Sequence, residues 1–195
     1  MTEEENLALK ICILGDSAVG KTSLIRKYTY DIFNDQYITT MGTKVTKKNI
    51  SIDMPKYNKK FNITFSIHDI MGDANLLGIL NQSHFQGMNG AFLVCDATRP
   101  KTLENLIFWL DSLFKEGPKN ISLLCVANKS DLTGGHMFDI GDIPGLEEIF
   151  GAPWMLTSAK TGDNIEEAFR ILGKKMIKEY IKKTEPHLFS KAEKQ

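Results

Sequence analysis

The residues best suited to chemistry lie in a glycine-rich stretch near the N-terminus. Gly15 and Gly20 enclose four residues and are followed directly by Lys21 and Thr22, which matches the pattern G-x-x-x-x-G-K-[ST]. Such glycines let the backbone wrap an anion, with successive N–H groups pointing inward. Lys21 adds a positive charge for outer phosphates, and the Thr22 hydroxyl suits Mg²⁺, which prefers oxygen ligands. The stretch predicts a nucleoside triphosphate site contacted by Asp16, Ser17, Ala18, Val19, Gly20, Lys21, Thr22 and Ser23.

A second polar motif selects a base rather than a phosphate. Asn128, Lys129 and Asp131 follow the apolar run 123–127, so we expect them in a loop at the carboxyl end of a strand. The Asp131 carboxylate can accept two hydrogen bonds from the N1 and N2 groups of guanine. Adenine offers no such donor pair and would leave a desolvated carboxylate unpaired, which is costly. The motif therefore predicts a guanine nucleotide.

Ser158, Ala159 and Lys160 form a third motif, again just past a short apolar strand. From this position the backbone N–H of Ala159 could donate to the guanine O6. Each of the two later motifs is common in surface turns when it occurs alone. Together with the phosphate loop, in this order along the chain, they are specific for guanine-nucleotide binding.

The elements that must position these loops alternate along the chain. Continuous apolar runs, typical of strands buried on both faces, cover 7–14, 91–96, 123–128 and 154–157. Amphipathic runs predict helices at 21–30, 103–114 and 164–183. Alternating runs at 43–52 and 61–68 predict a hairpin joined by the polar residues 53–60. The pattern predicts an α/β fold with a doubly wound, mostly parallel six-stranded sheet and one antiparallel edge strand.

Composition limits the size of the fold and argues against several classes of protein. The chain has 195 residues, 42% hydrophobic and 25% charged, as in a single globular domain. Lys plus Arg number 24, as do Asp plus Glu, and no basic stripe or aromatic stacking set supports nucleic-acid binding. No apolar run is long enough to cross a bilayer, and residues 1–6 lack the order of a signal peptide. Cys12, Cys95 and Cys125 lie in apolar segments and are expected to be buried thiols in a reducing, cytosolic setting.

In this order the three motifs resemble those of the Ras superfamily of small GTPases, over about residues 7–183. The stretches 16–23 and 37–42 are similar to the phosphate loop and first switch of the Rab branch. The resemblance implies a P-loop G domain that binds GTP, GDP and Mg²⁺. By the same match Thr40 would bind Mg²⁺ and sense the γ-phosphate, Phe33 would pack on guanine and Tyr37 would cover the phosphates. Ordinary packing or an exposed loop is the alternative for Phe33 and Tyr37.

The resemblance breaks at the second switch, where the family has D-x-x-G-Q. Asp69 and Gly72 match, which implies a carboxylate that holds Mg²⁺ through water and an N–H that bonds the γ-phosphate. Asp73 replaces the glutamine that orients the attacking water. It is shorter, lacks the amide donor and carries a charge facing the phosphates. We therefore expect slow GTP hydrolysis, with Lys21, Thr40 and Asp73 closest to the chemistry. A place in the helix after the switch is favoured over catalysis for Gln82, His84 and Gln86.

The leading hypothesis is a Rab-like molecular switch in vesicle trafficking, a GTPase that is slow without a partner. Effectors, exchange factors and GTPase-activating proteins would act through its switch regions. Asp73 favours the alternative, a GTP/GDP-binding interaction module with little turnover. A P-loop kinase or ATPase is a third class, and Lys129 and Asp131 argue against it.

The expected G domain occupies residues 1–183, and residues 184–195 are expected to be a flexible tail. Because the tail ends without a cysteine, we expect no prenyl anchor. Lysines near the end are diluted by glutamates and allow at most weak contact with an anionic membrane surface. Residues 53–60 are longer than usual for the family, which indicates a surface insertion or a partner surface. We expect a cytoplasmic monomer, with peripheral membrane contact as the alternative location.

Overall fold

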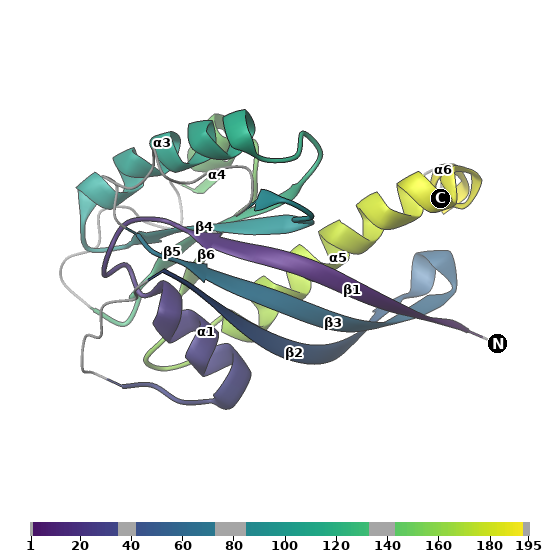
Figure 1. Ribbon diagram of the computed structural model, residues 1–195, viewed down its shortest axis with the longest axis horizontal. Coiled ribbons are helices and arrows are strands. Elements are labelled where there is room, and N and C mark those ends of the chain that lie inside the picture. Colours follow the sequence, from purple (N-terminus) through teal and green to yellow (C-terminus); the bar gives the residue numbers. More distant parts are fainter. Residues whose placement is uncertain (1, 35–41, 73–84, 133–142, 193–195) are drawn as a thin grey trace.

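A six-stranded sheet forms the centre of the protein (Figure 1). The structure is a computed structural model that describes residues 2–34, 42–72, 85–132 and 143–192. The strands are β1 Glu3–Leu14, β2 Thr43–Met54, β3 Lys59–Ile70, β4 Gly90–Asp96, β5 Ser122–Asn128 and β6 Trp154–Thr157. Their order is β2-β3-β1-β4-β5-β6, and β2 pairs antiparallel with β3 while the other pairs are parallel. The predicted mostly parallel sheet with one antiparallel edge strand is confirmed.

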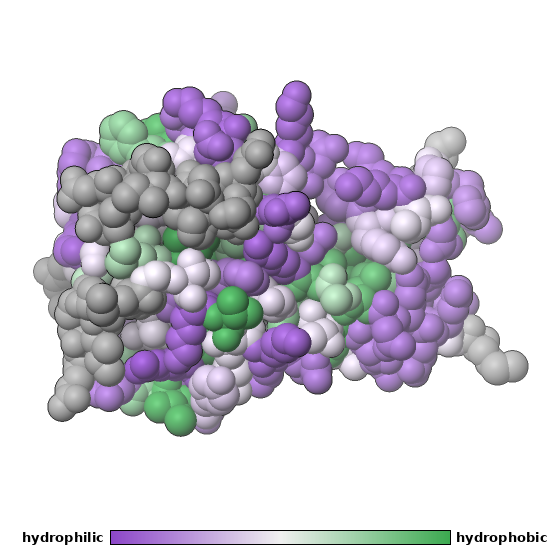
Figure 2. All heavy atoms as spheres, in the orientation of Figure 1, coloured by the Kyte–Doolittle hydropathy of each residue, from purple (hydrophilic) through white to green (hydrophobic). Residues whose placement is uncertain are grey.

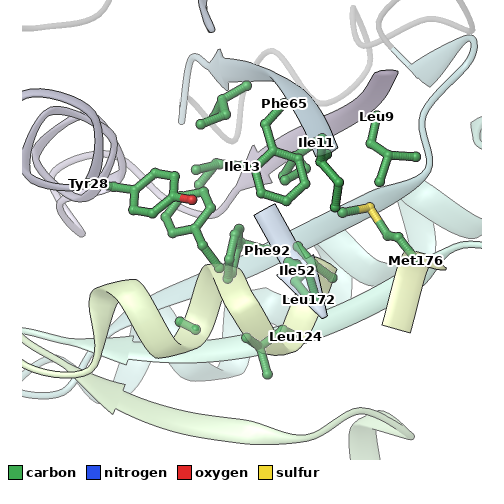
Figure 3. Packing of buried hydrophobic residues seen from close by; sticks show 14 of the residues in the cluster. Leu9, Ile11, Ile13, Tyr28, Ile52, Phe65, Phe92, Leu124, Leu172 and Met176 are labelled. Atoms are coloured by element: carbon green, nitrogen blue, oxygen red, sulfur yellow. The ribbon is translucent and has the colours of Figure 1, made fainter. Parts of the chain in front are cut away.

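Helices cover both faces of this sheet, as its buried central strands require. Residues of α1 (Lys21–Tyr30) and α5 (Ile165–Thr184) join one apolar cluster, whereas residues of α3 (Pro100–Glu116) and α4 (Ile143–Phe150) join the other. Successive residues of a strand point to opposite faces, so β1 supplies both clusters. Figure 3 shows Ile11 and Ile13 of β1 among side chains from α1 and α5. Within the described ranges, no helix combines the length and apolar character needed to span a membrane.

The three cysteines behave as the sequence predicts. Cys12, Cys95 and Cys125 are buried thiols without disulfide bonds. Burial raises the pKa of Cys12 and of Cys95 to about 12, because a thiolate is costly in an apolar environment. These thiols stay neutral and act as small core residues.

The hairpin of β2 and β3 is longer than the sequence suggests. The ladder runs from the pair Thr43 and Ile70 to the pair Met54 and Lys59, and a short 3-10 helix, η1 (Pro55–Tyr57), closes it. The expected polar connection 53–60 therefore contains strand residues. Met54, Tyr57 and Lys59 are also buried. Residues 186–192 contact η1 at the tip of this hairpin (Figure 1).

The chain folds into a further helix where the sequence leads us to expect a flexible tail. This helix, α6 (Pro186–Ala192), packs on η1, with the rings of Phe189 and Tyr57 stacked at a centroid distance of 6.4 Å. Ala192 is buried in the same cluster. Seven residues are too few for a helical period to stand out in sequence, so the expectation of a flexible tail is wrong for this segment. Hydrophilic residues cover most of this end of the molecule on the face that Figure 2 shows.

Candidate nucleotide-binding site

The glycine-rich loop lies between β1 and α1 and is packed tightly against its neighbours. A Cβ atom added to Gly15 would lie 2.1 Å from the Val94 carbonyl oxygen, and one added to Gly20 would lie 2.2 Å from Asn128 Nδ2. Both glycines also have positive φ angles, 139° and 98°, which other residues rarely adopt. The loop therefore needs glycine at both positions, for backbone conformation and for space.

Lys21 lies at the base of this loop with only 6% of its surface exposed. Its Nζ donates hydrogen bonds to the carbonyl oxygens of Gly15 and Asp16, both at 2.7 Å. Burial lowers the pKa of Lys21 to about 8, an effect that Asp69 and Asp16 only partly oppose. Among the described residues, no carboxylate lies within ion-pair distance of this ammonium group. Such a desolvated cation favours an anionic ligand.

Thr22 and Asp69 are 47 residues apart in sequence and meet beside Lys21. The Thr22 hydroxyl donates to Asp69 Oδ2 at 2.5 Å. The carboxylate of Asp69 is buried, and its Oδ1 accepts no hydrogen bond from the described residues. Burial raises the pKa of Asp69, although the hydrogen bond from Thr22 opposes this shift. An unsatisfied carboxylate oxygen next to a hydroxyl is the oxygen donor set that Mg²⁺ prefers, so these residues fit the predicted metal site.

Gly72 approaches the same loop from the end of β3. A Cβ atom at this position would lie 2.2 Å from Lys21 Nζ and 2.5 Å from the Asp16 carbonyl oxygen. The backbone of Gly72 therefore lies against the phosphate loop, as its predicted contact with the γ-phosphate requires. His68, four residues earlier, is half-buried with Nε2 3.2 Å from the Ser66 hydroxyl.

The base motif joins the other two motifs through Asn128. Its Nδ2 donates to the Val19 carbonyl oxygen at 2.9 Å, and its Oδ1 accepts from the Ala159 N–H at 3.1 Å. The Ser158 hydroxyl donates to Asp131 Oδ1 at 2.6 Å and fixes that carboxylate. The loops that were expected to hold phosphates and guanine thus meet at the carboxyl end of the sheet.

Some predicted site residues are less tightly held or fall outside the described residues. Phe33 is half-buried and packs against the apolar cluster of α1 and α5, which favours the packing alternative. Lys160 is exposed. Tyr37, Thr40 and Asp73 lie outside the residues that the structure describes.

Asp16 faces away from the site that the sequence assigns to it. Its carboxylate accepts hydrogen bonds from Asn105 Nδ2 at 2.7 Å and from Trp109 Nε1 at 2.9 Å, both on α3. The side chain therefore anchors the loop to α3, which leaves its backbone for contact with a ligand. An aspartate beside phosphates would repel them, so the outward orientation has a clear electrostatic reason.

Asp96 is a site residue that sequence reasoning missed. It ends β4 opposite Asn128 in the strand register, and its Oδ2 lies 2.7 Å from Lys129 Nζ. Arg99, just after it, donates from Nη2 to the Ser17 carbonyl oxygen at 3.1 Å. The signal was available, because an aspartate that ends a buried parallel strand lies at the same edge as the other loops.

Comparison with known proteins agrees with this geometry. Residues 10–178 match the model of the Ras family, a span that reaches from β1 into α5. The chain is also 30% identical over 169 residues to the Ras-related protein Rab-1D of Dictyostelium discoideum, covering 87% of this chain and 79% of that protein. The match to the family, over residues 10–178, includes every motif placed above. The chain therefore belongs to the Ras family of small GTPases.

Proposed function

We propose that this protein is a Rab-type guanine-nucleotide switch with slow intrinsic GTP hydrolysis. The observation that carries the proposal is the side chain of Asn128, which bonds to Val19 of the phosphate loop and to Ala159 of the third motif. One amide thereby fixes the distance between the predicted phosphate and base sites. Preorganised donors of this kind lose little freedom when a ligand binds.

Each site residue has a role in this proposal. Lys21 and the backbone N–H groups of the loop bind the β- and γ-phosphates, and Asp131 accepts from guanine N1 and N2. Thr22, Asp69 and, from the first switch, Thr40 would hold Mg²⁺, which would neutralise phosphate charge. The Gly72 N–H contacts the γ-phosphate, so the second switch responds to which nucleotide is bound.

Slow hydrolysis is proposed because Asp73 stands where the family has glutamine. A carboxylate cannot donate to the transition-state oxygens, and its charge opposes those of the phosphates. Like charges about 4 Å apart repel by about 1 kcal/mol in water and about 4 kcal/mol at an intermediate dielectric. We therefore expect the side chain to position the attacking water poorly, so that fast hydrolysis requires a partner protein.

Single-turnover hydrolysis of GTP on the purified protein tests this proposal. We expect Asp73→Gln to accelerate the step by about tenfold or more, equivalent to about 1.4 kcal/mol of barrier. Asp73→Ala is the matched control, since it removes the charge without supplying an amide, and we expect a smaller gain. Equal rates for the wild type and Asp73→Gln would show that position 73 does not limit hydrolysis.

A second candidate function is a GTP- or GDP-binding interaction module that barely turns over, which the same Asp73 favours. Hydrolysis that cell extract stimulates supports the switch, because it reveals an activating partner. Hydrolysis that stays negligible with extract supports the module. In either case we propose a cytoplasmic monomer whose effectors and exchange factors contact the switch regions.

A further inference from the structure

Asp96 is a buried carboxylate near the nucleotide site with four polar contacts among the described residues. Its side chain is 1% exposed. Oδ1 accepts from the Thr98 N–H at 3.0 Å and the Thr98 hydroxyl at 2.7 Å, while Oδ2 accepts from Arg99 Nε at 2.8 Å and pairs with Lys129 Nζ at 2.7 Å. Burial disfavours the charged form, but these contacts outweigh it and lower the pKa of Asp96 to about 2. The carboxylate is therefore ionised at physiological pH.

One of its two cationic partners belongs to the base loop. Lys129 follows Asn128 and has a φ angle of 69°, in the left-handed region that a residue with a Cβ rarely adopts. Such a conformation persists only where the surroundings impose it. Two interactions impose it here. Lys129 pairs with Asp96, and the Ser130 N–H donates to the Thr157 carbonyl oxygen at 3.0 Å.

The other partner belongs to the phosphate side of the site. Arg99 donates one hydrogen bond from Nε to Asp96 and a second from Nη2 to the Ser17 carbonyl oxygen, the latter at 3.1 Å. Arg99 is 44% exposed and Lys129 is 33% exposed, so neither side chain is held by packing alone. Their shared anion is what holds both cations in place.

We infer that Asp96 is a positioning residue that couples the base loop to the phosphate loop, by holding Lys129 with one bond and orienting Arg99 toward Ser17 with another. The inference rests on the proposed function, since coupling is useful only if one ligand spans both loops. Asp96 acts in this inference through Lys129 and Arg99. Removing its charge loosens both loops together, whereas removing Arg99 loosens only the phosphate loop.

Calorimetric titration with GDP and with GMP in magnesium buffer separates these effects. Arg99→Gln should weaken GDP binding by about three- to tenfold, the range for one net hydrogen bond, and GMP binding by less than twofold. Lys101→Gln is the matched control, because Lys101 lies two residues after Arg99 and, among the described residues, forms an ion pair only with the exposed Glu104. It should change neither affinity.

Asp96→Asn and the double variant then test the coupling. Asp96→Asn should weaken both GDP and GMP by about tenfold or more, because charge-assisted bonds to two loops are lost. In that background Arg99→Gln should cost no further GDP affinity, which makes the double-mutant cycle non-additive. Additive effects, or equal losses of GDP and GMP affinity in Arg99→Gln, would overturn the inference.

Failure of the coupling can be told apart from failure of the proposed function. Wild-type protein that binds neither GDP nor GMP contradicts the proposed function. Wild-type binding with an additive cycle contradicts only the role of Asp96. If Asp96→Asn does not fold, as thermal unfolding would reveal, the GDP-to-GMP comparison in Arg99→Gln alone decides the question.

Discussion

Two buried lysines lie at opposite ends of the molecule, and their surroundings differ in kind. Lys21 starts α1 at the carboxyl end of the sheet, and Lys59 starts β3 at the hairpin end (Figure 1). They are 6% and 4% exposed. The ammonium of Lys21 bonds to two carbonyl oxygens. That of Lys59 pairs with Glu5 at 3.2 Å, Glu3 at 3.7 Å and Glu185, and the Tyr180 hydroxyl also donates to Glu5.

The partners decide what each buried charge does. Burial lowers the pKa of Lys21 to about 8 because no carboxylate among the described residues neutralises it closely. For Lys59 burial acts in the same direction, but the hydrogen bonds to Glu185 and Glu5 outweigh it and raise the pKa. Lys59, whose positive charge is compensated by glutamates, joins β1, β3 and the residue between α5 and α6 as a structural clip. A buried ammonium that lacks such a partner instead favours binding an anion.

Removing the charge of Lys21 should produce the largest effect on function. We expect Lys21→Met to weaken GDP binding by about 100-fold or more, since a charge-assisted bond in a desolvated site is lost. The stability of the ligand-free protein should change by no more than about 1 kcal/mol, because the substitution also removes a costly buried charge. Titration calorimetry and denaturant unfolding measure the two quantities. A large loss of stability with unchanged GDP affinity would reverse the assignment of the two lysines.

Lys59→Met should show the opposite pattern. It leaves three carboxylates near an apolar cluster, and we expect it to lower the free energy of unfolding by about 1–3 kcal/mol, less than for a fully buried pair because the glutamates are partly exposed. GDP affinity should stay within about twofold. The neighbouring Lys60→Met is the control, because its pair with Glu4, at 3.4 Å, is exposed and should contribute less than about 0.5 kcal/mol. If Lys59→Met unfolds no more easily than Lys60→Met, the clip is not structural.

The smallest expected effect is a proton linkage that belongs to Lys21 alone. Bound phosphates favour its charged form, so GDP binding should take up a proton where the free protein has lost it, above a pKa of about 8. Between pH values of about 8 and 10.5, a lysine in the unfolded chain holds a proton that Lys21 in the folded protein has lost. The contribution of Lys21 to the free energy of unfolding therefore rises with pH over this interval. Lys59, whose pKa is raised above 10.5, contributes unchanged over this interval.

Calorimetry in buffers of different ionisation enthalpy measures the linkage directly. Proton uptake on GDP binding should be greater at about pH 8.5 than at about pH 7.0. Equal uptake at the two values would mean that Lys21 stays charged in the free protein. Burial would then not lower the pKa of Lys21 to about 8.

The sequence predicts what local, contiguous patterns encode. The phosphate loop, the base motif and each strand or helix lie within one short segment. The structure confirms the mostly parallel sheet with one antiparallel edge strand and brings the motif loops together. The place of Asp96 at the end of a buried parallel strand was visible in the sequence, but its pairing with Lys129 depends on the register of β4 against β5, which a single sequence does not reveal. Lys59 looked like part of a polar turn, because its partners Glu3, Glu5 and Glu185 lie far from it in the sequence. Asp16 matched a motif by position although its side chain faces α3.

The most direct test of the account is a competition between GDP and ADP for the wild-type protein in magnesium buffer. If Asp131 selects the base, GDP should bind more tightly than ADP by a factor on the order of 10⁴, as in sites built to hydrogen-bond one ligand. Asp131→Ala should remove most of that preference while leaving the protein folded. Equal affinities of the wild type for GDP and ADP would contradict the proposed guanine-nucleotide switch.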